Sequence, residues 1–181
     1  MRVTAKAENE QMAKKLVKPV VNEIKNRLGD SVYTTRGEKT LEQTVVDLLV
    51  ANDLTITTVE SCTGGLIAGR LINVPGVSEV YKSGEITYSN KAKRRILGVK
   101  KSTLQKHGAV SSQVVKEMCL GAAFFNRADV AVAVSGIAGP DGGSEEKPVG
   151  LVYIGCYVCG KTSVKECHFT GNRQKIRENT V

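Results

Sequence analysis

Apolar and polar residues form blocks along the chain that predict strands and helices in alternation. A strand over 54–59 is followed by a helix over 64–73, and a strand over 80–88 by a helix over 91–97 that Gly98 closes. A long helix capped by Ser111 precedes a buried strand at 130–134, and 150–169 forms two strands joined tightly at Gly160 and Lys161. This order predicts an α/β sandwich with a largely parallel sheet and one antiparallel pair.

The first 34 residues form a different pattern. Val3, Ala5 and Ala7 alternate as in a strand, 16–28 repeat apolar residues every fourth position as in a helix, and 32–34 predict a second short strand. Because these elements are too few to enclose a core, we expect them to dock on the rest or to belong to a larger domain. After a linker at 35–39, the spacing of Thr40 and Gln43 predicts a capping box and a helix to residue 52.

Composition narrows the class of protein. The 181 residues are 41% hydrophobic, with no apolar run long enough to span a bilayer and no secretory h-region at the N-terminus, so we expect a soluble, cytoplasmic protein. Five irregularly spaced cysteines fit a reducing compartment. Cys156 and Cys159, with Cys167 and His168 downstream, offer only a weak zinc interpretation, because strand positions three apart point to opposite faces.

The net charge of +8 raises anionic partners as candidates. Part of the excess is local, because residues 91–106 hold seven lysines and arginines and no acid. A solvated basic surface is the simpler interpretation. The absence of tryptophan and the low aromatic content make nucleic acid an unlikely partner.

The strongest candidate for chemistry is Ser61, which lies where the strand over 54–59 gives way to a helix. A hydroxyl there faces backbone N–H groups at the positive end of the helix dipole, so one turn can hold a nucleophile and an oxyanion. The amides of Thr63, Gly64 and Gly65 are the expected oxyanion donors. Cys62 is a possible thiolate nucleophile, but no histidine is placed to activate it.

A base for Ser61 is less evident from the residues. Asn90 is expected to cap the helix over 91–97, which puts Lys93 in the first turn, where the dipole and nearby cations disfavour an ammonium. Such a lysine can deprotonate a serine, and Tyr88 can relay the proton or orient the amine. The alternative is a surface lysine and a packing tyrosine. His107 and His168 are interpreted as structural.

The loop after the strand at 130–134 is rich in glycine. Gly136, Gly139, Gly142 and Gly143 let its backbone approach a ligand and present N–H groups to an anion, although such loops are often plain turns. Its place at the end of a parallel strand favours a ligand site.

Two other motifs are look-alikes. Residues 155–162 match a P-loop in letters but are interpreted as a hairpin, because strand formers surround them. Ser144 and Lys147 have Ser-x-x-Lys spacing, but Pro148 and the preceding glycines disfavour the helix that this motif needs. Ser144 is therefore only the second candidate nucleophile.

Four segments of the chain form a recognisable set: Val59–Gly65, Thr87–Lys93, Gly108–Ser111 and Ser135–Gly150. Together they resemble the CinA C-terminal domain family, which includes bacterial nicotinamide mononucleotide deamidases. The match runs from about Leu41 to the end of the chain, and residues 1–34 resemble the end of the middle domain of longer members.

The resemblance implies a three-layer α/β/α fold with a mixed, mostly parallel five-stranded sheet, usually in a homodimer. It implies hydrolysis of nicotinamide mononucleotide to nicotinic acid mononucleotide and ammonia without metal or cofactor, with Ser61, Lys93 and Tyr88 as catalytic residues. We expect the glycine-rich loop and Arg173 to hold the 5′-phosphate.

The resemblance also sets the expected domains. Residues 1–40 would be a remnant of the middle domain, and residues 41–181 the amidohydrolase domain, truncated in its last helix. The alternative function is a non-catalytic nucleotide- or DNA-associated binding module in competence or DNA damage responses.

Overall fold

A computed structural model describes all residues, 1–181, and divides into two compact units, Met1–Val45 and Val46–Val181. The first unit consists mainly of helix α1, Glu10–Leu28, which is followed by a 3-10 turn at Gly29–Ser31. The Asn9 side chain accepts from the Met12 N–H at its start, and Gly29, with a φ of 51°, ends it. Helix α1 was therefore predicted correctly in position and in its terminating glycine.

The two short strands expected in the first unit, at 3–7 and 32–34, are wrong. Both segments lack strand structure, and the chain has a single sheet to which neither contributes. Alternation of apolar and polar side chains does not by itself produce a strand, because the backbone N–H and C=O groups must also pair with a neighbouring strand. No partner pairs with either segment.

The second unit carries the sheet and six of the seven helices, counting α2, which begins before it. The Thr40 hydroxyl accepts from the Gln43 N–H at 3.2 Å, so the expected cap of α2 is confirmed. The helices are α2 Leu41–Ala51, α3 Leu66–Ile72, α4 Asn90–Leu97, α5 Lys101–His107, α6 Ser112–Asn126 and α7 Arg173–Asn179. The strands are β1 Ile56–Glu60, β2 Tyr81–Ile86, β3 Val130–Gly136, β4 Leu151–Val158 and β5 Lys161–His168.

The sheet has the order β2-β1-β3-β4-β5. Strand β1 pairs in parallel with β2 and β3, whereas β4 runs antiparallel to both β3 and β5. Four strands therefore share one direction and only β4 opposes them, which confirms the mixed, mostly parallel sheet. The β4–β5 hairpin turns at Cys159 and Gly160, so the P-loop look-alike is a hairpin as expected.

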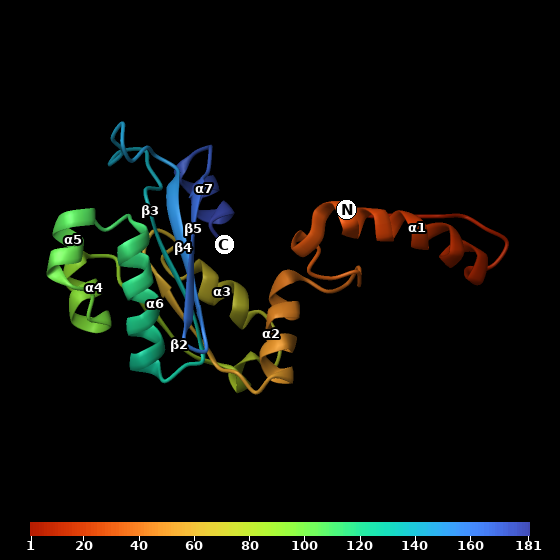
Figure 1. Cartoon of the computed structure of the whole chain (residues 1–181), viewed down its shortest axis with the longest axis horizontal. Coiled ribbons are helices and arrows are strands. Elements are labelled where there is room, and N and C mark those ends of the chain that lie inside the picture. The colour runs from red at the N-terminus through yellow and green to blue at the C-terminus, as the bar shows by residue number, and fades with distance from the viewer. The chain divides into compact units, whose positions relative to one another are not determined.

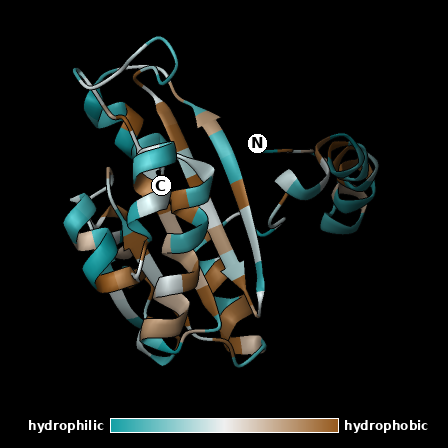
Figure 2. Ribbon diagram, turned by 60° about the vertical axis from the view of Figure 1, so that its left-hand side comes forward, coloured by the Kyte–Doolittle hydropathy of each residue, from teal (hydrophilic) through white to brown (hydrophobic).

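Helices cover both faces of this sheet (Figure 1). Helix α6 packs across β1, β3, β4 and β5 on one face, with α4 and α5 against it, and α3 and α7 lie on the other. Figure 2 shows apolar residues along the strands and on parts of the helices beside them, with hydrophilic residues on other parts of these helices. Val114, Val115 and Met118 of α6 have no exposed surface. The fold is α/β, as expected.

The carboxyl ends of β1, β2 and β3 meet at one edge of the sheet, because these strands are parallel neighbours. The Ser61 turn follows β1, the turn with Thr87 and Tyr88 follows β2, and the glycine-rich loop follows β3. The topology therefore brings three of the sequence's candidate segments together.

None of the helices has the length and apolar character needed to cross a membrane.

Candidate active site

Ser61 and Lys93 form a hydrogen-bonded pair at this edge of the sheet. The Lys93 Nζ atom donates to Ser61 Oγ at 3.0 Å, although the two residues are 32 positions apart. Ser61 directly follows β1, and Lys93 lies in the first turn of α4. Both side chains are buried. The structure thus brings together the nucleophile and base that the sequence had placed on separate elements.

Two backbone carbonyls fix the orientation of the Lys93 amine. Nζ also lies 2.7 Å from Thr87 O and 3.4 Å from Tyr88 O. Carbonyl oxygens only accept hydrogen bonds, so they hold two N–H groups in either protonation state. The third tetrahedral position faces Ser61 and carries an N–H when Lys93 is charged and a lone pair when it is neutral. In the neutral form the serine O–H can therefore donate to the amine.

Burial lowers the pKa of Lys93 from 10.5 to about 8, with the Cys62 thiolate form opposing the shift. Of the two expected causes, repulsion from Lys91, Arg94 and Arg95 is wrong, because these side chains are exposed to solvent, and the helix dipole stays a prediction. The expected cap is also wrong. Ser89 rather than Asn90 precedes α4, and its hydroxyl accepts from the Ala92 N–H at 3.1 Å.

Tyr88 contributes its backbone, rather than its phenol, to the pair. The Tyr88 hydroxyl accepts from Arg173 Nη2 at 3.1 Å and makes no hydrogen bond with Lys93 or Ser61. The proton relay through Tyr88 that the sequence suggested has no such path here. Arg173 also donates through Nη1 to Gly139 O at 2.7 Å. It therefore joins the turn after β2 to the glycine-rich loop.

The N-terminus of α3 is already occupied by the side chain of Glu60. Its carboxylate accepts from the N–H groups of Gly65 at 2.8 Å, Ile67 at 3.2 Å and Ala68 at 2.8 Å. Glu60 is 1% exposed, so this anion is part of the protein interior. The expectation that the free dipole end and the Gly65 amide stabilise an oxyanion is corrected, because both face Glu60. The amide of Gly64 makes no backbone hydrogen bond, whereas the amide of Thr63 lies against the Cys62 thiol.

Two buried hydroxyls beside the pair lack a partner. Thr63 Oγ1 and Thr87 Oγ1 have no hydrogen bond, and neither residue has exposed surface. An unpaired hydroxyl in such a place costs about 1–3 kcal/mol. Cys62 does not compete with Ser61 as nucleophile, because burial raises the pKa of its thiol and the backbone amides of Cys62 and Thr63 and the nearby cations offset this only in part.

The glycine-rich loop is held in place where it leaves β3 and by the side chain of Lys147. Gly136 is the last residue of β3, and a Cβ there would lie 2.6 Å from Val152 Cγ2, so this glycine serves strand packing rather than an anion cradle. Gly142 and Gly143 lie exposed at the tip. Lys147 Nζ donates to His107 O at 2.6 Å and Val110 O at 2.7 Å, which fastens the loop to the end of α5.

The Ser-x-x-Lys look-alike is a turn. The Ser144 hydroxyl accepts from the Lys147 backbone N–H at 3.1 Å, while the Lys147 amine is engaged by the two carbonyls beyond α5. Ser144 therefore has no base, and its place as second candidate nucleophile gains no support.

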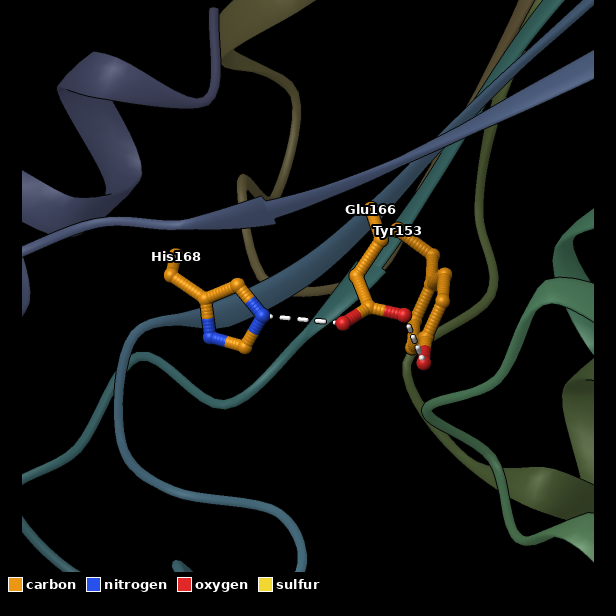
Figure 3. A network of polar contacts seen from close by, with 3 residues as sticks. All are labelled: Tyr153, Glu166 and His168. Atoms are coloured by element: carbon orange, nitrogen blue, oxygen red, sulfur yellow. Dashed lines mark hydrogen bonds and ion pairs between the residues drawn. The ribbon is translucent and has the colours of Figure 1, made fainter.

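His168 belongs to a separate network on the β4–β5 pair, shown in Figure 3. His168 Nε2 lies 2.8 Å from Glu166 Oε1, and the Tyr153 hydroxyl donates to Glu166 Oε2 at 2.8 Å. This network makes no hydrogen bond to Ser61 or Lys93. His107 contributes only its backbone carbonyl to the loop contact. Nowhere in the chain do three or more His, Cys, Asp or Glu side chains gather as metal ligands would.

Sequence reasoning missed Glu60 and Arg177. Arg177 donates through Nε to Cys62 O at 2.9 Å and through Nη2 to Thr63 O at 2.8 Å. Glu60 carried no local capping signal, because Gly65 rather than Glu60 directly precedes α3 and glutamate is not among the preferred N-cap residues. Arg177 had no such local signal, because its partners lie 114 and 115 positions away.

Comparisons with known proteins agree with this architecture. The family described as CinA C-terminal domain matches residues 38–181, and the family described as damage-inducible protein CinA KH domain matches residues 1–34. A Clostridium novyi relative that carries the name competence-damage inducible protein is 54% identical over all 181 residues, which are 44% of its length. A Clostridium beijerinckii relative of the same name is 52% identical over 98% of this chain and 43% of its own. The chain thus spans under half the length of these relatives.

Solved structures are similar as well. A competence/damage inducible protein from Agrobacterium tumefaciens superposes with a TM-score of 0.76 and 45% identity, over 77% of this chain and 86% of that one. A CinA superfamily protein from Escherichia coli gives a TM-score of 0.76 and 30% identity, over 84% of this chain and 91% of its own.

Proposed function

The chain belongs to the CinA family, and we propose that its second unit is an amidohydrolase that converts nicotinamide mononucleotide to nicotinic acid mononucleotide and ammonia. The observation that carries this proposal is the Lys93 amine, held 3.0 Å from Ser61 Oγ by two carbonyls that leave its third position for the serine. A buried lysine with a pKa of about 8 is neutral in about a tenth of molecules at pH 7 and in about half of them at pH 8, and the neutral form is the one that a general base needs.

The first half of the proposed reaction forms an acyl-enzyme. Ser61 Oγ attacks the carboxamide carbon while its proton passes to the neutral amine of Lys93. The carbonyl oxygen becomes an oxyanion beside the turn, where the Gly64 amide makes no backbone hydrogen bond and the Thr63 amide contacts only the Cys62 thiol. The ammonium of Lys93 then returns the proton to the departing nitrogen, and ammonia leaves.

The second half repeats these roles with water. Neutral Lys93 takes a proton from a water molecule that attacks the ester carbon, and the ammonium returns a proton to Ser61 Oγ as the carboxylic acid leaves. For the 5′-phosphate we propose the exposed tip of the glycine-rich loop with Arg173, whose guanidinium already contacts the loop at Gly139 O.

Ammonia release from nicotinamide mononucleotide tests the proposal. The wild type is expected to turn over, Ser61→Ala to lose on the order of a thousandfold or more in kcat, and Ser144→Ala, which changes an exposed serine of the glycine-rich loop, to keep the wild-type kcat. Retained turnover in Ser61→Ala would refute the assigned nucleophile. An inactive Ser144→Ala with a normal fold would move the nucleophile to the loop.

The relatives' names support one second candidate, a nucleotide- or DNA-associated binding module in competence or damage responses. KH modules hold nucleic acid on a Gly-x-x-Gly loop. Residues 1–34 contain a single glycine, Gly29, so this segment lacks that loop. Salt-sensitive retention of DNA together with absent amide hydrolysis would favour the binding module.

We also propose that the protein forms a homodimer. Phe124 and Phe125, at the end of α6, are 89% and 61% exposed, and such side chains supply apolar area for an interface. Sedimentation of the wild type and Phe124→Asp is the test. A dimer that Phe124→Asp leaves intact would show that this surface is not the interface.

A further inference from the structure

We propose that Arg177 is a positioning residue for the Ser61 turn. Its hydrogen bonds to two consecutive carbonyls orient the amides of Thr63 and Gly64 away from α7, and in this orientation the amides can receive the oxyanion. This inference rests on the proposed function, because it assigns the oxyanion donors of the same reaction. It adds a second residue of the last helix, after Arg173, to the site.

The contacts of Arg177 are specific and well supported. Its planar guanidinium donates through Nε to Cys62 O at 2.9 Å and through Nη2 to Thr63 O at 2.8 Å, so one rigid fork spans two adjacent peptide groups. Helix α7 is held in place because Ile176 is 1% exposed, in a cluster with Cys62, Ala138 and Val152. The Asn172 side chain caps the start of this helix.

Peptide geometry links these carbonyls to the amides. In a planar trans peptide the C=O of one residue and the N–H of the next point in opposite directions. The Cys62 carbonyl shares its peptide with the Thr63 amide, and the Thr63 carbonyl shares its peptide with the Gly64 amide. When Arg177 draws both carbonyls toward α7, both amides must point away from it.

Gly64 is the more open of the two donors. It is exposed, whereas Thr63 is fully buried and its amide lies close enough to the Cys62 sulfur to lower the pKa of that thiol. Gly64 also has a φ of 62°, a left-handed conformation that favours glycine. The turn thus reaches this orientation through a glycine and keeps it through Arg177.

The contacts of Glu60 explain why the oxyanion needs amides other than those at the start of α3. Its carboxylate uses the amides of Gly65, Ile67 and Ala68, so the helix end that would ordinarily receive an anion is filled. The turn is therefore held by an anion on its N–H side at α3 and by a cation on its C=O side at α7. Between these two contacts the exposed Gly64 amide is the one left to face a substrate.

The test compares Arg177→Lys, Arg177→Gln and Arg177→Met with Lys175→Met, a matched exposed cation on the same helix. For Arg177→Met we expect kcat on nicotinamide mononucleotide to fall on the order of 10- to 100-fold while KM changes less than about threefold, because an oxyanion contact exists only in the transition state. Arg177→Lys should recover part of the loss, and Lys175→Met should match the wild type. Thermal unfolding identifies any variant that has lost its fold. If Arg177→Met is unfolded, the kinetics of Arg177→Lys and Arg177→Gln are compared with those of the wild type instead.

A second readout separates this inference from the choice of substrate. A fluorophosphonate probe forms a bond from Ser61 Oγ to phosphorus and releases fluoride, with the phosphoryl oxygen occupying the oxyanion position. Labelling should slow at least about tenfold in Arg177→Met. Slowed labelling of Arg177→Met, together with no deamidation by the wild type, would support the positioning role of Arg177 and overturn the proposed substrate. Labelling and kcat that stay at wild-type values in folded Arg177→Met would overturn the role of Arg177.

Discussion

The buried Lys93 makes a prediction about stability that does not depend on the substrate. Replacing it in Lys93→Met removes an ionisable group whose pKa falls from 10.5 to about 8 on folding, because burial disfavours the ammonium. Below pH 8 the folded wild type must hold a charge that the unfolded chain holds more easily. This penalty shrinks as the pH rises from 8 to 10.5 and is absent above 10.5.

The size of the effect follows from linkage. Over the whole interval the penalty is about 3 kcal/mol, and the part relieved between about pH 7 and pH 10 is about 2.5 kcal/mol. The free energy of unfolding of the wild type, measured against that of Lys93→Met, should therefore rise by about this amount over that range. Methionine preserves the length of the side chain, and every other titrating group is common to both proteins.

Urea unfolding followed by circular dichroism, with reductant to protect the five cysteines, measures the difference at each pH. Lys91→Met is the matched control, because Lys91 is an exposed lysine on the same helix. Its difference from the wild type should stay flat with pH. A flat difference for Lys93→Met as well would refute the claim that burial lowers the pKa of this lysine.

Three further predictions concern the same site. In the wild type, kcat/KM should rise with pH and level off above an apparent pKa of about 8, since only neutral Lys93 accepts the serine proton; a profile flat from about pH 6 to pH 9 would contradict this. Thr87→Val should leave the free energy of unfolding unchanged or raise it, because the Thr87 hydroxyl has no hydrogen-bond partner to lose. The control Thr57→Val changes an equally buried threonine that is hydrogen-bonded to Ser83 O and Asn126, and it should lower the free energy of unfolding by about 1–3 kcal/mol. Equal losses in the two variants would mean that the Thr87 hydroxyl has a partner. Glu60→Gln sets an amide N–H against backbone N–H groups and should lower both stability, by about 1–3 kcal/mol, and kcat. Chemical denaturation and steady-state kinetics decide this last case, and unchanged values for both would contradict the clamp at α3.

Most elements of the second unit could be predicted from the sequence because their signals are local. The cap at Ser111, the glycine after α4 and the hairpin between β4 and β5 each depend on a few neighbouring residues. The hairpin turn lies at Cys159 and Gly160, one residue before the expected Gly160 and Lys161. Ser61 and Lys93 were both identified, each as a polar residue at a strand end or a helix start. The failed strand at 3–7 shows the limit of local signals, because pairing requires a partner that alternation does not supply.

The tertiary structure alone decided how these residues work together. The sequence determined most elements of the second unit, their order, and that a serine and a lysine follow parallel strands. It did not determine that burial rather than neighbouring charge lowers the pKa of Lys93, that Tyr88 bonds to Arg173, or that Glu60 fills the helix end. Arg177 reaches Cys62 across 115 residues. Desolvation and such contacts depend on which distant segments the sheet brings side by side, and no short stretch of chain carries that information.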